Sequence, residues 1–289
     1  MRREWIQAFC LLMPAMVLLF AFTHWPAIET LIQSFWSTGR GRRVSQFVGT
    51  ENYAKMMADP VFRQVMWNNA IYAAITIPAA IGISLVMALF VHRHIPGLAF
   101  LRIAFFTPTV LPLIAVANIW MFFYTPGFGL IEQVRGLFDL PAQNWVGQPE
   151  TALYAMIAVA VWKEAGFFMI FYLAALQTIP QSLREAADLE GTSRWTFFWR
   201  VTWPLIMPTT LFISVNAVIN AFRLIDHIIV MTKGGPNNAS MLLLYYIYEA
   251  GFAWWDTAYA ATLTVVMLTI LMAVAVGQFF LVDRKVHYK

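Results

Sequence analysis

Two ionisable residues stand next to each other inside a long apolar stretch of this sequence, AVAVWKEAGFFMIFY. They are Lys163 and Glu164. If the stretch crosses a membrane as a helix, such groups are costly in lipid and face a bundle interior or a path filled with water. Adjacent residues lie about 100° apart around a helix and do not face each other. At least one of the two therefore needs a partner on another element, or water in a cavity.

A second apolar stretch, SVNAVINAFRLIDHIIV, carries a regular series of polar side chains. Asn216, Asn220, Arg223 and Asp226 follow at offsets of four, three and three, which places them on one face of a helix. The lower part of this face, with Ser214, is rich in neutral groups that donate and accept hydrogen bonds. Such groups are the kind that hold the hydroxyls of a sugar.

One more amide, Asn118, lies near Trp120 in a third apolar stretch, and the indole ring is suited to stack on a sugar face. A purely structural interpretation stays open for each residue, because asparagines hold membrane helices together and Arg223 can pair with Asp226. Taken as a group, these side chains predict a polar translocation cavity, since several stretches contribute them at similar depth.

Motifs of catalysis and nucleotide binding are absent from the sequence. It has no G-x-x-x-x-G-K-[ST], no H-E-x-x-H and no G-x-S-x-G. The single cysteine, Cys10, excludes a disulfide within the chain. The His92-x-His94 pair has no evident third ligand for a metal. We therefore predict that the chain is not an enzyme and holds no cofactor, and that any ATP is bound by another chain.

The composition predicts an integral membrane protein. Of 289 residues, 60% are hydrophobic and only 12% are charged, about half the charged fraction of soluble domains. The expected fold is all-α and polytopic, one transmembrane domain over residues 1–289. Six apolar segments are long enough to span a bilayer. They cover residues 8–35, 66–91, 99–124, 151–176, 206–231 and 257–281.

An even number of spans puts both chain ends on the same side of the membrane. With the amino terminus inside, ten basic residues fall in inner segments and seven in outer ones, so the positive-inside rule favours cytoplasmic ends. The difference is small because the Arg40–Arg43 region is on the outer side.

The loop at residues 177–205 is the longest polar interruption in the second half of the chain. We expect Glu185-Ala186-Ala187 to start a short helix and Gly191 to provide a sharp turn. A second short helix, capped by Thr192 or Ser193, would end at Pro204. Such a helix–turn–helix can be gripped by a partner protein, or it can lie in the lipid interface as an amphipathic linker.

The loop resembles the EAA loop of ABC-importer permeases. The matching residues, which keep the spacing of that motif, are Glu185, Ala186, Ala187, Gly191 and Pro204. Val201 and Trp203 depart from it, where the family has Ile and Leu. In that family the loop is the coupling helix that docks on the ATP-hydrolysing subunit, and the resemblance implies the same role here.

The similarity to carbohydrate-importer permeases extends along the chain, through FVGTENY, Trp162-Lys163, AALQTIPQSLREAADLEG, TKGGPNNA and the basic tail. It implies a type I ABC importer permease fold. Substrate contacts carried over from the family fall on Lys163, Glu164 and Phe167, and near Ser214, Val218 and Asn220. Lys163 and Glu164 replace uncharged residues of maltose-type members, so a neutral and an acidic substrate both remain open.

The implied protein is a permease subunit in a bacterial inner membrane that takes up a sugar, a polyol, glycerol phosphate or an acidic sugar. Its expected partners are a second permease subunit, two ATPase subunits, an extracytoplasmic substrate-binding protein and membrane lipids.

The main alternative is a secondary transporter driven by an ion gradient, with Asp226, His227 and Glu164 as a proton relay. It predicts an inverted repeat and broken helices, neither of which is evident in the sequence. A scaffold or channel component that transports nothing is a third interpretation.

Overall fold

The computed structural model describes residues 2–39, 44–92 and 97–283, and in these ranges the regular structure is helical. One isolated bridge joins Trp36 to Phe47. The all-α prediction is therefore confirmed. Three parts of the sequence discussed above lie outside the described residues. They are His94 of the candidate metal pair, the whole Arg40–Arg43 region and the basic tail after residue 283.

The chain divides into two compact units. The first comprises Met1–Phe62 and Tyr246–Thr269, and the second comprises Arg63–Tyr245 and Ile270–Lys289. Three helices have residues in both units: α4 (Pro60–Val91), α13 (Leu243–Tyr248) and α14 (Thr257–Asp283).

In the first unit, one apolar span is built from three helical pieces. They are α1 (Arg2–Leu19), a π-helical turn (Phe20–His24) and α2 (Trp25–Gln33). The short helix α3 (Glu51–Ala58) and a second π-helical turn (Glu249–Ala253) complete this unit.

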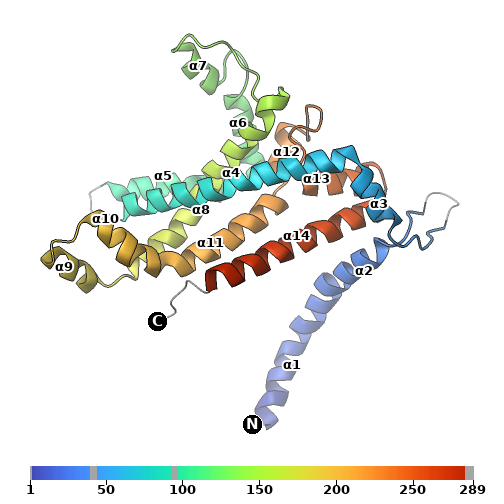
Figure 1. Ribbon diagram of the computed structural model, residues 1–289, viewed down its shortest axis with the longest axis horizontal. Coiled ribbons are helices and arrows are strands. Elements are labelled where there is room, and N and C mark those ends of the chain that lie inside the picture. Colours follow the sequence, from blue (N-terminus) through green and yellow to red (C-terminus); the bar gives the residue numbers. More distant parts are fainter. Residues whose placement is uncertain (1, 40–43, 93–96, 284–289) are drawn as a thin grey trace. The chain divides into compact units, whose positions relative to one another are not determined.

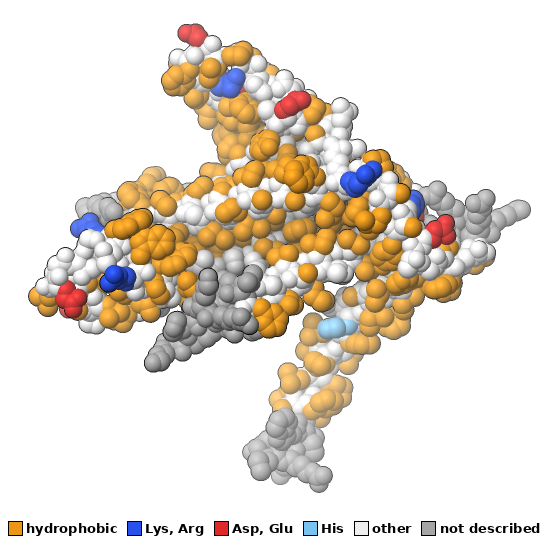
Figure 2. Space-filling view, in the orientation of Figure 1, with side chains coloured by type: hydrophobic (Ala, Val, Ile, Leu, Met, Phe, Trp, Pro, Cys, Tyr) orange, Lys and Arg blue, Asp and Glu red, His pale blue; other side chains and the backbone are white. Residues whose placement is uncertain are grey.

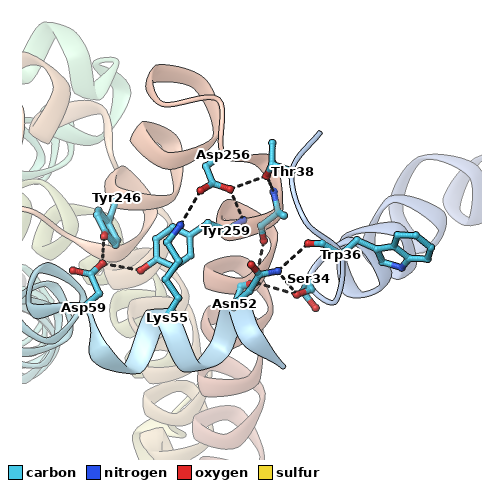
Figure 3. Close-up of polar contacts among 11 residues, drawn as sticks. Ser34, Trp36, Thr38, Asn52, Lys55, Asp59, Tyr246, Asp256 and Tyr259 are labelled. Carbon is cyan, nitrogen blue, oxygen red and sulfur yellow. Dashed lines mark hydrogen bonds and ion pairs between the residues drawn. The ribbon is translucent and has the colours of Figure 1, made fainter. Parts of the chain in front are cut away.

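A polar network centred on Asp256 ties the first unit together (Figure 3). The Asp256 carboxylate accepts hydrogen bonds from the Thr38 hydroxyl at 2.7 Å and from the Lys55 ammonium at 2.9 Å. The Thr38 hydroxyl oxygen in turn accepts the Ala258 amide at 2.9 Å. Burial raises the pKa of Asp256, but these hydrogen bonds and the Lys55 charge outweigh it and lower the pKa from its ordinary value.

A second carboxylate, Asp59, stands between α3 and α4 and binds two tyrosines of the same unit (Figure 3). The hydroxyls of Tyr246 and Tyr259 both donate to its Oδ2 atom. The carboxylates of Asp59 and Asp256 thus connect the region of α3 to the start of α14. These two helices are almost 200 residues apart in the sequence.

The second unit contains the helices that matter for the candidate site. They are α5 (Leu98–Val110), α6 (Leu113–Phe123), α7 (Leu130–Gly136), α8 (Pro149–Gln177), α9 (Gln181–Leu189), α10 (Arg194–Phe197), a π-helical turn (Phe198–Thr202), α11 (Trp203–Arg223) and α12 (Asp226–Met231). Helices α4, α8 and α11 run side by side, with α9 and α10 at one end (Figure 1).

The core of this unit lies between α4, α8 and α11. Its buried side chains include Val91, Phe168, Tyr172 and Ile213. Helix α8 is the central helix of this core, since 67% of its most apolar 18-residue stretch is buried.

Helices lie where the sequence predicted apolar spans, but two of them are interrupted. Among the described residues, five helices are long and apolar enough to cross a membrane, or six if one bent pair counts as a span. In that pair, α5 and α6 meet at 104°. The fifth span is also interrupted, between α11 and α12, where Leu224 adopts an extended conformation. Broken helices, which were not evident in the sequence, are therefore present in the structure.

Helices α5 and α8 approach closely at one glycine. A Cβ atom at Gly166 would overlap the carbonyl oxygen of Phe105. Because this neighbour is backbone, a side chain here would have to push the two helices apart.

We therefore expect Gly166→Val to destabilise the second unit by about 1–3 kcal/mol through overpacking. Thermal unfolding of the purified protein in detergent would show this as a lower Tm. The matched control is Gly82→Ala on α4, where an added Cβ meets nothing within 4 Å. Equal Tm values for Gly166→Val and the unchanged chain would contradict the close packing.

Candidate functional site

The break between α5 and α6 follows from two prolines. Leu111 precedes Pro112 and is extended, with φ −73° and ψ 138°, the conformation that a following proline imposes. In a continuous helix the Pro108 carbonyl would accept the amide of residue 112, but proline has no N–H group. The helix therefore ends with carbonyl oxygens that lack partners in their own chain segment.

Lys163 of α8 supplies those partners. Its ammonium donates to the carbonyl oxygens of Pro108 at 3.0 Å, Thr109 at 3.3 Å and Leu111 at 2.6 Å. An ammonium group has three donors, so all are used at the break. The prediction that one member of the Lys163–Glu164 pair finds its partner on another element is confirmed.

Glu164, the next residue, is buried and faces a different environment. It lines a cavity of about 170 Å³ within the second unit. The cavity walls come from α5, α6, α8, α11, α12 and Leu224, one of the two residues between α11 and α12. The lining residues are Thr109, Leu113, Ala160, Lys163, Glu164, Phe167, Asn220, Leu224 and His227.

Three of the residues that line the cavity each carry a buried polar atom that has no hydrogen-bond partner among the described residues. These atoms are Oγ1 of Thr109, Oε2 of Glu164 and Nδ1 of His227. The Asn220 side chain, from α11, interacts with Glu164. The other imidazole nitrogen, Nε2 of His227, lies 3.2 Å from the Tyr72 hydroxyl.

Unpartnered buried polar atoms cost about 1–3 kcal/mol each. A cavity that gathers three of them is therefore suited to water molecules or to a ligand with several hydroxyl groups. Hydroxyl groups fit best, because each one can both donate and accept a hydrogen bond. A hydroxyl can therefore bond to a carboxylate, to an imidazole nitrogen or to another hydroxyl.

The structure brings together four of the eight substrate residues predicted from the sequence. Lys163, Glu164, Phe167 and Asn220 all line the cavity. Thr109 was not predicted as a site residue from the sequence, and His227 was predicted only as part of a proton relay. The prolines around Thr109 were the available signal, because they mark a helix break where a side chain can reach a cavity.

The other four predicted residues do not line this cavity. Asn118, Ser214 and Asn216 donate to carbonyl oxygens of their own helices, at 2.9, 2.8 and 2.8 Å. Arg223 is exposed at the end of α11, and no ion pair with Asp226 is found in the described part of the chain. Substrate contact by these four residues stays a prediction.

The loop at residues 177–205 forms the expected helix–turn–helix. Glu185, Ala186 and Ala187 lie within α9, and Gly191 turns the chain with φ +67°. The turn is closed by hydrogen bonds from the Thr192 amide to the Ala187 carbonyl at 2.9 Å and from the Gly191 amide to the Asp188 carbonyl at 3.2 Å.

Two expectations about this loop are wrong in detail. The first helix begins at Gln181, before Glu185. The second does not end at Pro204, because α10 continues through the π-helical turn into α11. Pro204 lies in the first turn of α11, a position where proline is tolerated in helices. Of the two candidate caps, Ser193 is the one used, since its side chain accepts the Thr196 amide at 3.2 Å.

Residues 80–288 match the family described as binding-protein-dependent transport system inner membrane component. The chain is 33% identical over 292 residues to the sn-glycerol-3-phosphate transport system permease protein UgpA of Salmonella typhimurium, a match that covers 100% of this chain and 97% of the relative. It is 31% identical over 268 residues to the sulfoquinovosyl glycerol transport system permease protein SmoG of Agrobacterium fabrum, covering 92% and 87%.

The fold is also that of a solved transporter chain. A bacterial ABC transporter involved in the import of the acidic polysaccharide alginate superposes with a TM-score of 0.85 at 20% identity, covering 98% of this chain and 96% of that chain. At this identity the likeness concerns the fold alone.

The contacts of Lys163 generate a prediction that separates support of the helix break from substrate binding. Lys163→Met keeps the side-chain length but removes all three donors. We expect less folded protein and less assembled complex, because three buried carbonyl oxygens lose their partner. Glu164→Gln, at the adjacent position, should assemble normally. Yields of complex from size-exclusion chromatography measure both.

A Lys163→Met variant that assembles fully and loses only transport would show instead that Lys163 acts on the substrate, as the sequence predicted.

Proposed function

The chain belongs to the family of binding-protein-dependent transport system inner membrane components, and on that premise we propose that it carries a small polyhydroxylated solute, a glycerol or sugar derivative, into the cell. It is the permease subunit of a binding-protein-dependent ABC importer, a multi-pass inner membrane protein and not itself an enzyme. Such an importer works with an ATPase and a periplasmic binding protein. This chain has broken helices, as the alternative of a secondary transporter predicts. Its family membership nevertheless leaves that alternative without support.

The substrate class is supported by two relatives and by the cavity. UgpA belongs to a transport system for sn-glycerol-3-phosphate, and SmoG to one for sulfoquinovosyl glycerol. Both names combine a glycerol unit with further polar groups. The observation that carries the proposal is the set of unpartnered polar atoms of Thr109, Glu164 and His227 at one cavity, with Asn220 beside them.

The cavity favours the hydroxyl-bearing part of such a solute. The Lys163 donors are engaged by carbonyl oxygens, and the neighbouring ionisable group is the Glu164 carboxylate. A phosphate or sulfonate here would have no free ammonium to offset its charge, because the Lys163 donors are already engaged. An acidic group on the substrate would therefore bind elsewhere, on the partner permease or near the cavity mouth.

The proposed complex has a second, similar permease subunit and two ATPase subunits, with both chain ends in the cytoplasm. In this scheme Glu185, Ala186, Ala187, Gly191 and Pro204 mark the coupling loop. The chain enters that loop from α8 and leaves it into α11, and those helices carry Glu164 and Asn220. Closure of the ATPase pair would shift the loop and with it two walls of the cavity. Direction follows from the different substrate affinities of the two states.

The cavity prediction uses two asparagines of the same helix. Asn220→Ala removes an amide from the cavity wall, whereas Asn216→Ala removes one that bonds only to the Phe212 carbonyl of its own helix. A lost buried hydrogen bond costs about 1 kcal/mol, which corresponds to about fivefold in affinity. We expect uptake by Asn220→Ala to fall by about this factor, and uptake by Asn216→Ala to stay near that of the unchanged chain.

Uptake of radiolabelled glycerol 3-phosphate or another transported glycerol derivative into proteoliposomes, normalised to assembled complex, measures the effect. Equal uptake by the two variants would remove the cavity from the transport path. Competition by a neutral glycerol glycoside and by its phosphate then tests whether the acidic group contributes to recognition.

The coupling prediction rests on the backbone of Gly191. Its φ of +67° is accessible to glycine and tolerated by asparagine, whereas proline is locked near −65°. Gly191→Pro should abolish uptake and the stimulation of ATP hydrolysis, while the protein still inserts in the membrane. Gly191→Asn, the matched control, should retain most of both activities. Normal ATP-driven uptake by Gly191→Pro would contradict docking through this turn.

A further inference from the structure

The helix that follows the coupling turn is longer than a membrane requires. It runs from Arg194 to Arg223, through α10, the π-helical turn and α11, before the break at Leu224. This stretch exceeds the length of about 20 residues that crosses the hydrocarbon region. Part of it must therefore lie outside the hydrocarbon. The amino-terminal end is the part next to the polar turn at Gly191, so the excess falls on α10 and the π-helical turn after it.

This excess segment and the first residue of α11 together carry three tryptophans at a spacing of four. We call Trp195, Trp199 and Trp203 the tryptophan stripe. Their ring centroids are 5.5 Å apart between Trp195 and Trp199 and 5.8 Å apart between Trp199 and Trp203. Trp203 packs against the core of the second unit, whereas Trp195 and Trp199 are 71% and 47% exposed. The stripe thus leads from the core to the surface beside the coupling turn.

The charges around the stripe differ from those on α9. Arg194 and Arg200 are exposed next to the exposed tryptophans. Helix α9 and its turn present one basic side chain, Arg184, and three acidic ones, Glu185, Asp188 and Glu190, and so are net negative. Figure 2 shows charged side chains of both signs at this end of the second unit, bordering a hydrophobic surface. An anionic surface would attract the segment with the stripe and repel α9.

A membrane surface meets all of these conditions. Tryptophan is enriched at the headgroup level, where its ring is partly in lipid and its N–H group stays hydrated. Arginine side chains form charge-assisted hydrogen bonds to phosphates, and each basic residue near an anionic leaflet adds to the attraction. The length of the helix places the stripe at this level.

We propose that Trp195 and Trp199 insert into the headgroup region of the inner leaflet, with Arg194 and Arg200 bound to phosphates of anionic lipids. The tryptophan stripe is then a lipid-binding surface that holds the coupling turn at a fixed depth, while α9 remains free to meet the ATPase. The two sequence-based interpretations of the loop, docking helix and interfacial linker, thus apply to different halves of it.

The position of the stripe can be measured by spin labelling. The unchanged chain has Cys10 as its single cysteine, so Cys10→Ser combined with Trp195→Cys or Trp199→Cys takes one nitroxide label. The labelled permease is assembled with its partner subunits in nanodiscs of phosphatidylethanolamine and phosphatidylglycerol. Ser45→Cys, in an exposed loop of the first unit, is the control for a label in water.

The measured quantity is the ratio of collisions with oxygen to collisions with a water-soluble nickel chelate. This ratio should be several-fold higher for the labels at 195 and 199 than for the label at 45. Labels that are as accessible to nickel as the control would overturn the proposal. Labels that are shielded from both reagents only when the ATPase subunits are present would also overturn it, because the ATPase would then be the partner of the stripe.

A second measurement covers the case in which a cysteine variant does not assemble. Trp195→Phe combined with Trp199→Phe keeps two aromatic rings. Brominated phosphatidylglycerol should quench the tryptophan fluorescence of the unchanged complex more than that of this double variant. Equal fractional quenching would refute lipid contact. Neither measurement uses substrate, so this proposal and the proposed solute can fail independently.

Discussion

The structure depends on one constraint, that backbone polar groups within a membrane must find partners inside the protein. The break between α5 and α6 would violate it, since Pro112 cannot donate to the Pro108 carbonyl. Lys163 meets the constraint from α8, with three donors for three carbonyl oxygens. This arrangement requires α8 to lie close to α5, and Gly166 permits the approach. Lysine, glycine and the two prolines therefore form one structural unit that stabilises a bent span.

The same bend gives the permease its cavity. A straight α5–α6 helix would have its carbonyl oxygens engaged and would present an apolar side to α8. Bent, it places Thr109 and Leu113 around a space that Glu164, Asn220 and His227 border from other helices. Adjacent residues of α8 thus have different roles, because they point in different directions around the helix. Lys163 supports the backbone, and Glu164 faces the cavity with one oxygen unpartnered.

The coupling loop lies in the same compact unit as the cavity. It joins α8 to α11, so a partner that moves it acts directly on both helices. The continuous helix from α10 through the π-helical turn into α11 makes this connection stiff on one side. On the other side, Gly191 isolates α9 as a separate short helix. Such a division suits the role proposed for this loop, in which it contacts an ATPase and transmits movement to the transmembrane helices.

The sequence by itself determined the membrane class, the place of each span, the EAA-like turn at Gly191 and four of the cavity residues, because apolar length, glycine and motif spacing are local properties. Tertiary structure alone decided which polar side chains meet. Asn216 and Asn220 look equivalent in sequence, yet one bonds to its own helix and the other faces Glu164. Pro204 also looked like a helix end, but a proline is equally compatible with a first turn. The reason is physical: a polar group in a membrane takes whichever partner packing brings within reach, and packing joins residues distant in sequence.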